Sequence, residues 1–240
     1  MAELSVVVPV FNERGNVAGL LDEIAAALRG RIDFEAVFVD DSSGDDTLAV
    51  LRAALARMPE LRVIHHARQS GQSTAIRTGV RAARAPWIAT LDGDGQNDPA
   101  DIPKLLAMRD AAPAEVKLFA GWRVERKDSG SKRWASKWAN AIRSRLLRDE
   151  TPDTGCGIKL FEREAFLDLP YFDHMHRYLP ALMQRAGWRV QSVPVNHRPR
   201  GAGVSKYNNL NRALVGIADL RGVAWLIRRS KRTASHEIDG

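Results

Sequence analysis

Residues 86–96 read PWIATLDGDGQ, an apolar run that ends in two carboxylates one residue apart, Asp92 and Asp94. A strand that ends in this way presents two oxygen ligands at the carboxyl edge of a sheet, where open α/β sheets usually form their ligand crevice. Oxygens at that edge suit Mg²⁺ or Mn²⁺ held against a diphosphate. Because Asp and Gly also form ordinary turns, the segment alone leaves a plain turn and a metal site equally open.

Two further apolar runs end in polar residues. The run over residues 4–10 is followed by residues 11–13 (FNE), and the run over residues 36–39 is followed by residues 40–41 (DD). Each end alone could be a strand-to-helix turn with an N-cap. The carboxyl ends of consecutive parallel strands meet at one edge of a sheet, so three such ends together indicate a nucleotide site.

The apolar periodicity alternates between strand and helix through the first half of the chain. Buried strands are predicted where β-branched and apolar residues run together, and helices where apolar residues recur every turn. This order predicts right-handed βαβ units, and therefore an α/β fold with a mainly parallel central sheet flanked by helices. The predicted strands cover residues 4–10, 36–39, 61–64 and 87–91, and the predicted helices cover residues 14–29, 45–58 and 72–84.

The composition limits the class of protein. The chain has 240 residues, of which 45% are hydrophobic, so it can bury a large core. Its one cysteine, Cys156, cannot form a disulfide within the chain, which fits a reducing compartment. Cys156 lies in a Gly-Cys-Gly turn, where we expect a small packed residue rather than a nucleophile. We expect no secretory signal and no transmembrane helix, because no window of about 18 residues is free of charge.

Charge is distributed unevenly along the chain. The net charge of +7 divides into −4 over residues 1–120 and +11 over residues 121–240. The acidic half suits a metal, and the basic half suits a polyanion or an anionic membrane surface, unless it serves only solubility. Residues 123–148, with two tryptophans, and residues 209–227 carry apolar stripes at helical spacing beside basic side chains. The first helix could lie on a membrane surface or pack its stripe against the core, and the second is too charged to span a bilayer but could lie in the membrane interface.

Several phosphate-binding and nucleophile motifs are missing from the sequence. It contains no P-loop, no glycine-rich dinucleotide fingerprint at the first predicted helix and no G-x-S-x-G elbow. Phosphates would therefore be held by a metal ion rather than by a glycine loop. The histidines at positions 65, 66, 174 and 176 lack zinc spacing, and we expect them to form hydrogen bonds or to lie on the surface.

Four segments together resemble family 2 glycosyltransferases. The first three are shared across many family 2 enzymes. The R-x-x-G-x-S-K pattern of the fourth segment resembles the signature of one branch of the family, which contains the dolichol-phosphate mannose synthases and their bacterial polyprenyl-phosphate relatives. The resemblance covers almost the whole chain, and it implies a GT-A fold over residues 1–208 and C-terminal amphipathic helices, with the basic helix of residues 209–240 at the membrane surface. The segments are residues 8–13 (VPVFNE), 39–43 (VDDSS), 91–96 (LDGDGQ) and 200–206 (RGAGVSK).

The resemblance also implies a set of site residues. A UDP- or GDP-sugar would bind at the strand ends with Mg²⁺ or Mn²⁺, and Asp92, Asp94 and Gln96 would hold the metal. Phe11 replaces the family's common tyrosine, and Gly93 replaces its common alanine. The nucleotide and the donor would be contacted by Pro9, Phe11, Asn12, Glu13, Val39, Asp41, Asp92, Gly93, Arg123, Arg200 and Lys206, and the acceptor phosphate by Arg133, Ser136 and Ser205.

The implied reaction is inverting transfer of a sugar from the nucleotide-sugar to a polyprenyl (undecaprenyl or dolichyl) phosphate, with Asp94 and Asp153 as catalytic residues. A phosphate monoester is mostly ionised near neutral pH (second pKa about 6), so it needs little help from a base. Asp153 is the best candidate for a helping carboxylate, although an Asp in Thr-Pro-Asp-Thr is a turn residue by default. The alternative is a family 2 enzyme with a hydroxyl acceptor, and that enzyme would need a true general base.

The location follows from the acceptor. The pair of C-terminal membrane helices present in many members of the family is missing here, as is the Q-x-x-R-W pattern of processive synthases. We therefore expect a cytoplasmic enzyme, peripheral on the cytoplasmic face of an anionic membrane, with no nucleic-acid partner. A non-catalytic basic protein for membrane or RNA would leave the three acidic strand ends unexplained.

Overall fold

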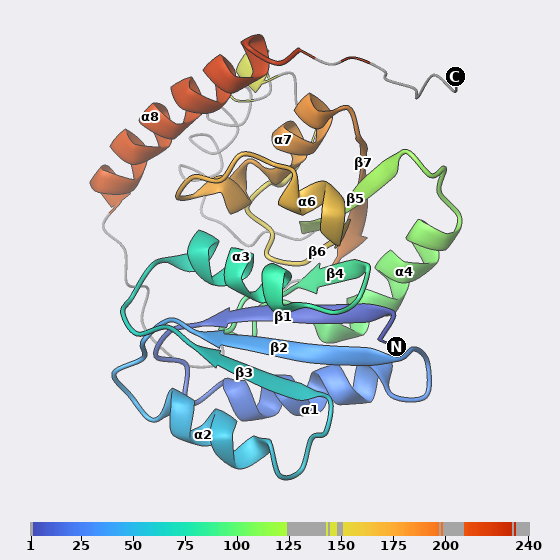
Figure 1. Cartoon of the computed structure of the whole chain (residues 1–240), viewed down its shortest axis with the longest axis vertical. Helices are drawn as coiled ribbons and strands as arrows, with labels where there is room; N and C mark the ends of the chain where they lie inside the picture. The colour runs from blue at the N-terminus through green and yellow to red at the C-terminus, as the bar shows by residue number, and fades with distance from the viewer. Residues whose placement is uncertain are drawn as a thin grey trace, which may run out of the picture.

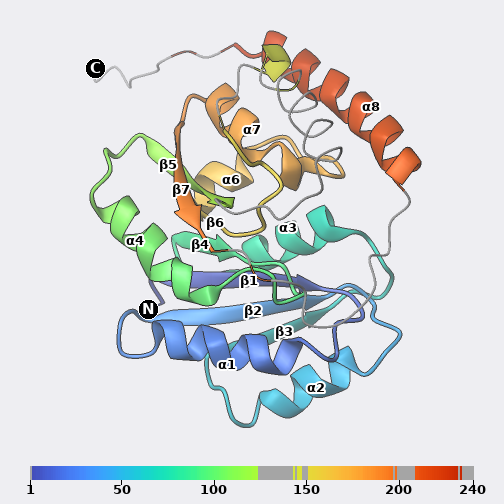
Figure 2. The same cartoon turned by 180° about the vertical axis from the view of Figure 1, so that it is seen from behind.

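The computed structural model describes residues 2–123, 143, 145–147, 151–196, 198, 209–231 and 233. A seven-stranded sheet crosses the molecule, and helices cover both of its faces (Figures 1 and 2). The strands are β1 (Leu4–Val10), β2 (Phe34–Asp40), β3 (Leu61–His65), β4 (Trp87–Thr90), β5 (Val116–Arg123), β6 (Lys159–Glu162) and β7 (Arg189–Val195). The helices are α1 (Val17–Leu28), α2 (Thr47–Ala54), α3 (Gln72–Ala82), α4 (Ile102–Asp110), α6 (Arg163–Leu167), α7 (Leu179–Ala186) and α8 (Asn209–Arg228), with the short 3-10 helices η1 (Pro99–Asp101) and η2 (Met175–Arg177).

The strand order is β3-β2-β1-β4-β6-β5-β7. All pairs are parallel except those made by β6, which runs antiparallel to β4 and β5. The strands β2, β1 and β4 are direct neighbours, so their carboxyl ends meet at one edge. The predicted α/β fold with a mainly parallel sheet is confirmed, and the reversal of β6 is the feature that the periodicity did not indicate.

The central strands are apolar on both sides because each face carries its own helices. In β1, Val6 and Val8 pack in one core with Leu21 of α1, while Val7 packs in the other with Val80 of α3. Helices α1, α2 and α4 cover the first face, and α3, α6 and α7 cover the second (Figures 1 and 2). A strand buried on both sides gains stability from every apolar residue, which explains the unbroken valine run.

The predicted C-terminal helix is present as α8 and packs against the body of the protein. Val223 and Ala224 are buried. Tyr178 and Arg185 donate hydrogen bonds to carbonyl oxygens of α8, at 3.2 and 3.0 Å. A domain boundary at residue 208 stays a prediction, and the predicted basic helix at residues 123–148 lies almost entirely outside the described residues. Among the described helices, none combines the length and the apolar character that a membrane span requires.

Helix α3 lies so close to the sheet that Gly79 has no room for a side chain. A methyl group there would lie 2.4 Å from Val7 Cγ1 and 3.2 Å from Val39 Cγ2. We expect Gly79→Ala to lower the free energy of unfolding by roughly 1–3 kcal/mol through overpacking, measured by urea denaturation. The matched control is Gly19→Ala in α1, where no atom lies within 4 Å. It should stabilise by up to about 1 kcal/mol because alanine favours helix. Equal stabilities of the two variants would contradict the close approach.

Candidate active site

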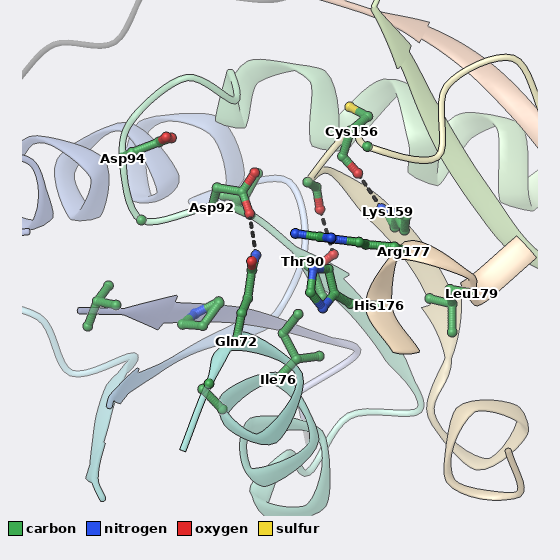
Figure 3. A pocket seen from close by; sticks show the side chains of 18 of the residues that line it. Gln72, Ile76, Thr90, Asp92, Asp94, Cys156, Lys159, His176, Arg177 and Leu179 are labelled. Carbon is green, nitrogen blue, oxygen red and sulfur yellow. Dashed lines mark hydrogen bonds between the residues drawn. The ribbon is translucent and has the colours of Figure 1, made fainter. Parts of the chain in front are cut away.

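A cavity of about 440 Å³ opens beside the carboxyl ends of β1 and β4 and extends to β6, α3 and η2 (Figure 3). The three polar strand ends that the sequence indicated therefore border one pocket. Nine of the predicted site residues line it: Pro9, Phe11, Glu13, Asp41, Asp92, Gly93, Asp94, Gln96 and Arg123.

Three other predicted residues lie near the pocket but do not line it. Asn12 joins the loops after β1 and β2, because its backbone N–H donates to Ser43 Oγ (2.8 Å) and its Oδ1 accepts from the Gly44 N–H (2.7 Å). Val39 is fully buried in the core beside α3. Asp153 contacts Arg123, which lines the pocket, but does not line the pocket itself. Five predicted residues, Arg133, Ser136, Arg200, Ser205 and Lys206, lie outside the described residues.

Asp92 is held in place from several sides. Its carboxylate accepts a hydrogen bond of 2.8 Å from the amide of Gln72, the first residue of α3, and its backbone N–H donates to Asn97 Oδ1 at 2.8 Å (Figure 3). A side chain at Gly157 would lie 2.1 Å from Asp92 Oδ2, so only glycine fits there. A methyl group on Gly93 would lie 2.7 Å from Val10 Cγ1. Gly93 thus lets the loop rest directly on β1.

The electrostatics of Asp92 fit a bound cation. Burial, followed by repulsion from Asp94, raises the pKa of Asp92 above its ordinary value, although Lys159 and the Gln72 amide act in the opposite direction. Within the described residues, no group of three or more His, Cys, Asp or Glu side chains could surround a metal. Two carboxylates on one loop nevertheless suit Mg²⁺ or Mn²⁺, because such ions often complete their shell with substrate phosphates and water.

The other predicted metal residues follow on the same loop. Asp94 Oδ1 accepts a hydrogen bond from the backbone of Gln96 at 3.2 Å. The carbonyl oxygen of Gln96 accepts from the Arg198 N–H at 3.1 Å, and the Gln96 amide donates back to the Arg198 carbonyl at 3.4 Å. Arg198 also forms ion pairs with Glu23 (2.8 Å) and Asp98 (2.5 Å). Arg198 is thereby fixed beside the acidic loop.

Arg123 and Asp153 form a bidentate ion pair at the edge of the pocket. Arg123 Nε lies 2.6 Å from Asp153 Oδ2, and Arg123 Nη2 lies 2.9 Å from Asp153 Oδ1. Asp153 is 4% exposed, and its hydrogen bond raises the pKa of Arg123 further. This arrangement favours a positioning role for Asp153, while its role as a helping carboxylate stays a prediction.

The loops on the β2 side are fixed by histidine–aspartate pairs. His66 Nδ1 lies 2.7 Å from Asp41 Oδ1, and the backbone N–H groups of Ser70 and Gly71 donate to the Asp41 carboxylate at 2.9 and 2.8 Å. His65 pairs with the neighbouring carboxylate of Asp40 at 2.7 Å in the same way. These histidines form hydrogen bonds, as the sequence predicted.

The far end of the pocket carries polar residues that the sequence analysis missed. Lys159, His176 and Arg177 line it. His176 Nδ1 lies 2.7 Å from Ser73 Oγ, and burial, with smaller contributions from Lys159 and Arg177, lowers the pKa of His176 to about 3, so this ring is neutral. Burial also lowers the pKa of Lys159, against the attraction of Cys156, Asp92 and Asp153. The only hint in the sequence was a lysine placed directly before the apolar pair Leu160 and Phe161 of β6.

The family comparison agrees with this geometry. The family model described as glycosyl transferase family 2 matches residues 5–169. The chain is 36% identical over 235 residues to the dodecaprenyl-phosphate galacturonate synthase of Rhizobium johnstonii, covering 96% of this chain and 69% of that protein. It is 33% identical to the undecaprenyl-phosphate 4-deoxy-4-formamido-L-arabinose transferase of Pseudomonas fluorescens, covering 85% of this chain and 60% of that one. The chain belongs to glycosyl transferase family 2.

Solved structures agree on the fold. Glucosyl-3-phosphoglycerate synthase from Mycobacterium tuberculosis, solved with Mg²⁺ and UDP, is similar with a TM-score of 0.69 at 16% identity, over 95% of this chain and 79% of that one. A mannosyltransferase from Pyrobaculum calidifontis, solved with GDP-Man and Mn²⁺, gives a TM-score of 0.67 at 20% identity, over 98% of this chain and 66% of that one. Both are glycosyltransferases of the GT-A architecture, and this chain shares it.

The contact between Gly157 and Asp92 generates a prediction. In Gly157→Ala the new methyl group must displace the Asp92 carboxylate or shift β6, so Asp92 would leave the position where we expect it to hold a metal. We expect the rise in melting temperature on adding UDP or GDP with Mn²⁺ to disappear, measured by thermal unfolding. Gly19→Ala should keep the full rise. A Gly157→Ala protein with an unchanged nucleotide-dependent rise would show that the position of Asp92 does not matter.

Proposed function

We propose that this chain is an inverting glycosyltransferase that moves a sugar from a nucleotide-sugar to a polyprenyl phosphate with the help of Mg²⁺ or Mn²⁺. The observation that carries the proposal is the carboxylate pair Asp92 and Asp94 at the strand edge, with cationic side chains on the opposite side of the same pocket. The names of both relatives above state a polyprenyl-phosphate product or acceptor, and these matches span nearly all or most of the chain.

The lining residues suggest how the nucleotide-sugar donor lies in the pocket. The strand ends of β1 and β2 provide Phe11, Glu13 and Asp41 for the nucleoside, and the acidic loop after β4 provides the position for the diphosphate. When bound, a divalent cation at Asp92 and Asp94 would neutralise the charge that develops on the leaving nucleoside diphosphate. Arg123, oriented by Asp153, adds a charge-assisted hydrogen bond at the same place. The solved glycosyltransferases above hold UDP or GDP-Man in this fold, which supports either base here.

The acceptor makes little demand on a general base. A polyprenyl phosphate is already an anionic oxygen nucleophile near neutral pH. Asp153 has both carboxylate oxygens on Arg123, which suits an enzyme that orients charges rather than one that deprotonates a hydroxyl. We propose Arg133, Ser136 and Ser205 for the acceptor phosphate, and Arg200 and Lys206 for the donor phosphates. The fixed position of Arg198 at Gln96, two residues before Arg200, supports the last pair.

We propose that the protein binds to the cytoplasmic face of an anionic membrane, because the tail of its polyprenyl phosphate acceptor lies in lipid. Helix α8 supports this. Opposite its buried side it exposes Ile217 (50%) and Trp225 (56%), with Arg221 and Arg228 also exposed. Apolar side chains that alternate with arginine suit the boundary between lipid headgroups and acyl chains.

The acidic loop gives the direct test of the function. We expect the purified chain with Mn²⁺, undecaprenyl phosphate and a panel of UDP- and GDP-sugars to form a mild-acid-labile glycolipid. Asp94→Asn should keep the melting temperature and lower turnover at least about 10²-fold, because one anion of the metal position is lost. Asp33→Asn, the same change at an exposed position, should keep full turnover. Near-normal turnover of Asp94→Asn at saturating Mn²⁺ would reject the metal assignment, and a product formed only on hydroxyl acceptors would reject the acceptor.

The exposed side of α8 can be tested separately. The chain should sediment with vesicles of phosphatidylcholine and phosphatidylglycerol, be partly released by high salt, and bind pure phosphatidylcholine poorly, because each basic residue contributes about 1 kcal/mol near an anionic surface. Trp225→Ser should weaken sedimentation by removing apolar burial that salt does not screen. Trp122→Ser on β5, where the tryptophan is 39% exposed, is the matched control. A protein that stays in the supernatant at low salt would overturn the surface assignment.

A further inference from the structure

The far end of the pocket contains two basic side chains, Lys159 and Arg177, that form no ion pair with a carboxylate of the described residues. Lys159 is 5% exposed and donates its hydrogen bond to the carbonyl oxygen of Cys156. Within the described part of the chain, no carboxylate forms an ion pair with Lys159, and the Arg177 side chain forms neither a hydrogen bond nor an ion pair. Figure 3 shows Arg177 extending into the pocket from η2. A buried charge without an ion-pair partner is unfavourable, so Lys159 favours an anion beside it, and the half-buried Arg177 can contact the same anion.

The surroundings make this end selective for a small charged group. Both cations lie close enough to His176 to act on its charge, so they border the same space. His176 itself is neutral and fixed to Ser73, and therefore offers a hydrogen bond but no charge. Apolar side chains of Ile76, Phe166 and Leu179 also line the pocket, together with the polar Thr90. Apolar side chains beside a charge pair lower the local dielectric constant and thereby strengthen the attraction between the charges.

The order of groups along the pocket identifies the anion. In the proposed binding mode the nucleoside lies at the ends of β1 and β2 and the diphosphate lies at Asp92 and Asp94. Lys159 of β6 and Arg177 of η2 line the next part of the pocket. In a nucleotide-sugar the group that follows the diphosphate is the sugar. A sugar that carries a carboxylate at C6 would bring a single anion to this end, and the relative from Rhizobium johnstonii is named for galacturonate.

We propose that Lys159 and Arg177 form a carboxylate subsite, and that the donor sugar is a uronic acid. The inference rests on the proposed function only in that the pocket takes a nucleotide-sugar. His176 would contribute a neutral hydrogen bond to the same sugar. Lys159 and Arg177 would bind the carboxylate with charge-assisted hydrogen bonds, and a neutral hexose would leave both cations unpaired.

Binding of donor pairs that differ only at C6 tests the subsite. Calorimetry with the full chain, Mn²⁺ and no acceptor compares UDP-galacturonate with UDP-galactose, and UDP-glucuronate with UDP-glucose. We expect the better uronate to bind roughly tenfold or more tightly than its neutral partner, the ratio that one charge-assisted hydrogen bond supplies. Equal affinities within both pairs, or no binding of either uronate, would overturn the proposal.

Two variants tie the preference to these side chains. Arg177→Met should bring the ratio of affinities close to one, and Lys159→Met should do the same provided that it unfolds at the wild-type temperature. Arg81→Met, an exposed arginine on α3 outside the pocket, should keep the wild-type ratio. An unchanged ratio in Arg177→Met would overturn the proposal even if Lys159→Met failed to fold.

The phosphate of the acceptor is the other anion that Lys159 and Arg177 could bind. A separate binding experiment distinguishes this possibility from a sugar carboxylate. Binding of farnesyl phosphate in the presence of UDP and Mn²⁺ should be the same in wild type and Arg177→Met. If Arg177→Met weakens farnesyl phosphate and leaves the donor ratio unchanged, the cations serve the acceptor and the carboxylate subsite is wrong. Since the donor arm contains no acceptor, a uronate preference without transfer to polyprenyl phosphate would reject the proposed function and leave the subsite intact.

Discussion

The site depends on one close contact, the carboxylate of Asp92 against the backbone of Gly157. The contact is possible only because residue 157 has no side chain, and it joins the acidic loop after β4 to the start of β6. The Thr90 hydroxyl strengthens the junction with a hydrogen bond of 2.8 Å to the Gly157 carbonyl oxygen. Since β6 is the one reversed strand, its first residue, Lys159, comes to the same sheet edge as the carboxyl ends of β1 and β4. Acidic and basic groups far apart in sequence thus face one cavity.

This junction separates two opposite electrostatic demands. Burial, and then repulsion from Asp94, raises the pKa of Asp92, so a cation beside the two carboxylates would stabilise their charged form. Among the described residues, Lys159 and Arg177 form no ion pair, so a negative group bound between them would be stabilised. A donor that brings a metal-bound diphosphate and, one bond further, a carboxylated sugar would satisfy both demands at once. Binding of such a donor would give each charge cluster a partner of opposite sign: the metal ion for Asp92 and Asp94, and the sugar carboxylate for Lys159 and Arg177.

The first half of the fold could be predicted because its strands and helices follow from the spacing of apolar residues close together in the sequence. The valine run of β1 and the spacing of α1 and α3 gave the sheet and its covering helices, and the strand-end carboxylates gave Asp92 and Asp94. Gln72, His176 and Arg177 could not be found in this way, because tertiary packing brings them to the pocket: Gln72 meets Asp92 across 20 positions, and His176 meets Ser73 across 103. The same limit explains Asp153, whose contact with Arg123 spans 30 positions and gives it a partner that the local turn pattern does not show. Val39 was placed by motif at the nucleotide, yet alternation along β2 turns its side chain into the core beside α3.

The most direct measurement of the central claim is the metal dependence of nucleotide affinity. Titration calorimetry of UDP and of GDP should be carried out on the wild-type chain with Mn²⁺ and with EDTA. We expect the preferred nucleotide to bind at least about tenfold more tightly with Mn²⁺, because the diphosphate would share the ion with Asp92 and Asp94. Equal affinity in EDTA would contradict the account, since the carboxylate pair would then repel the diphosphate rather than hold it.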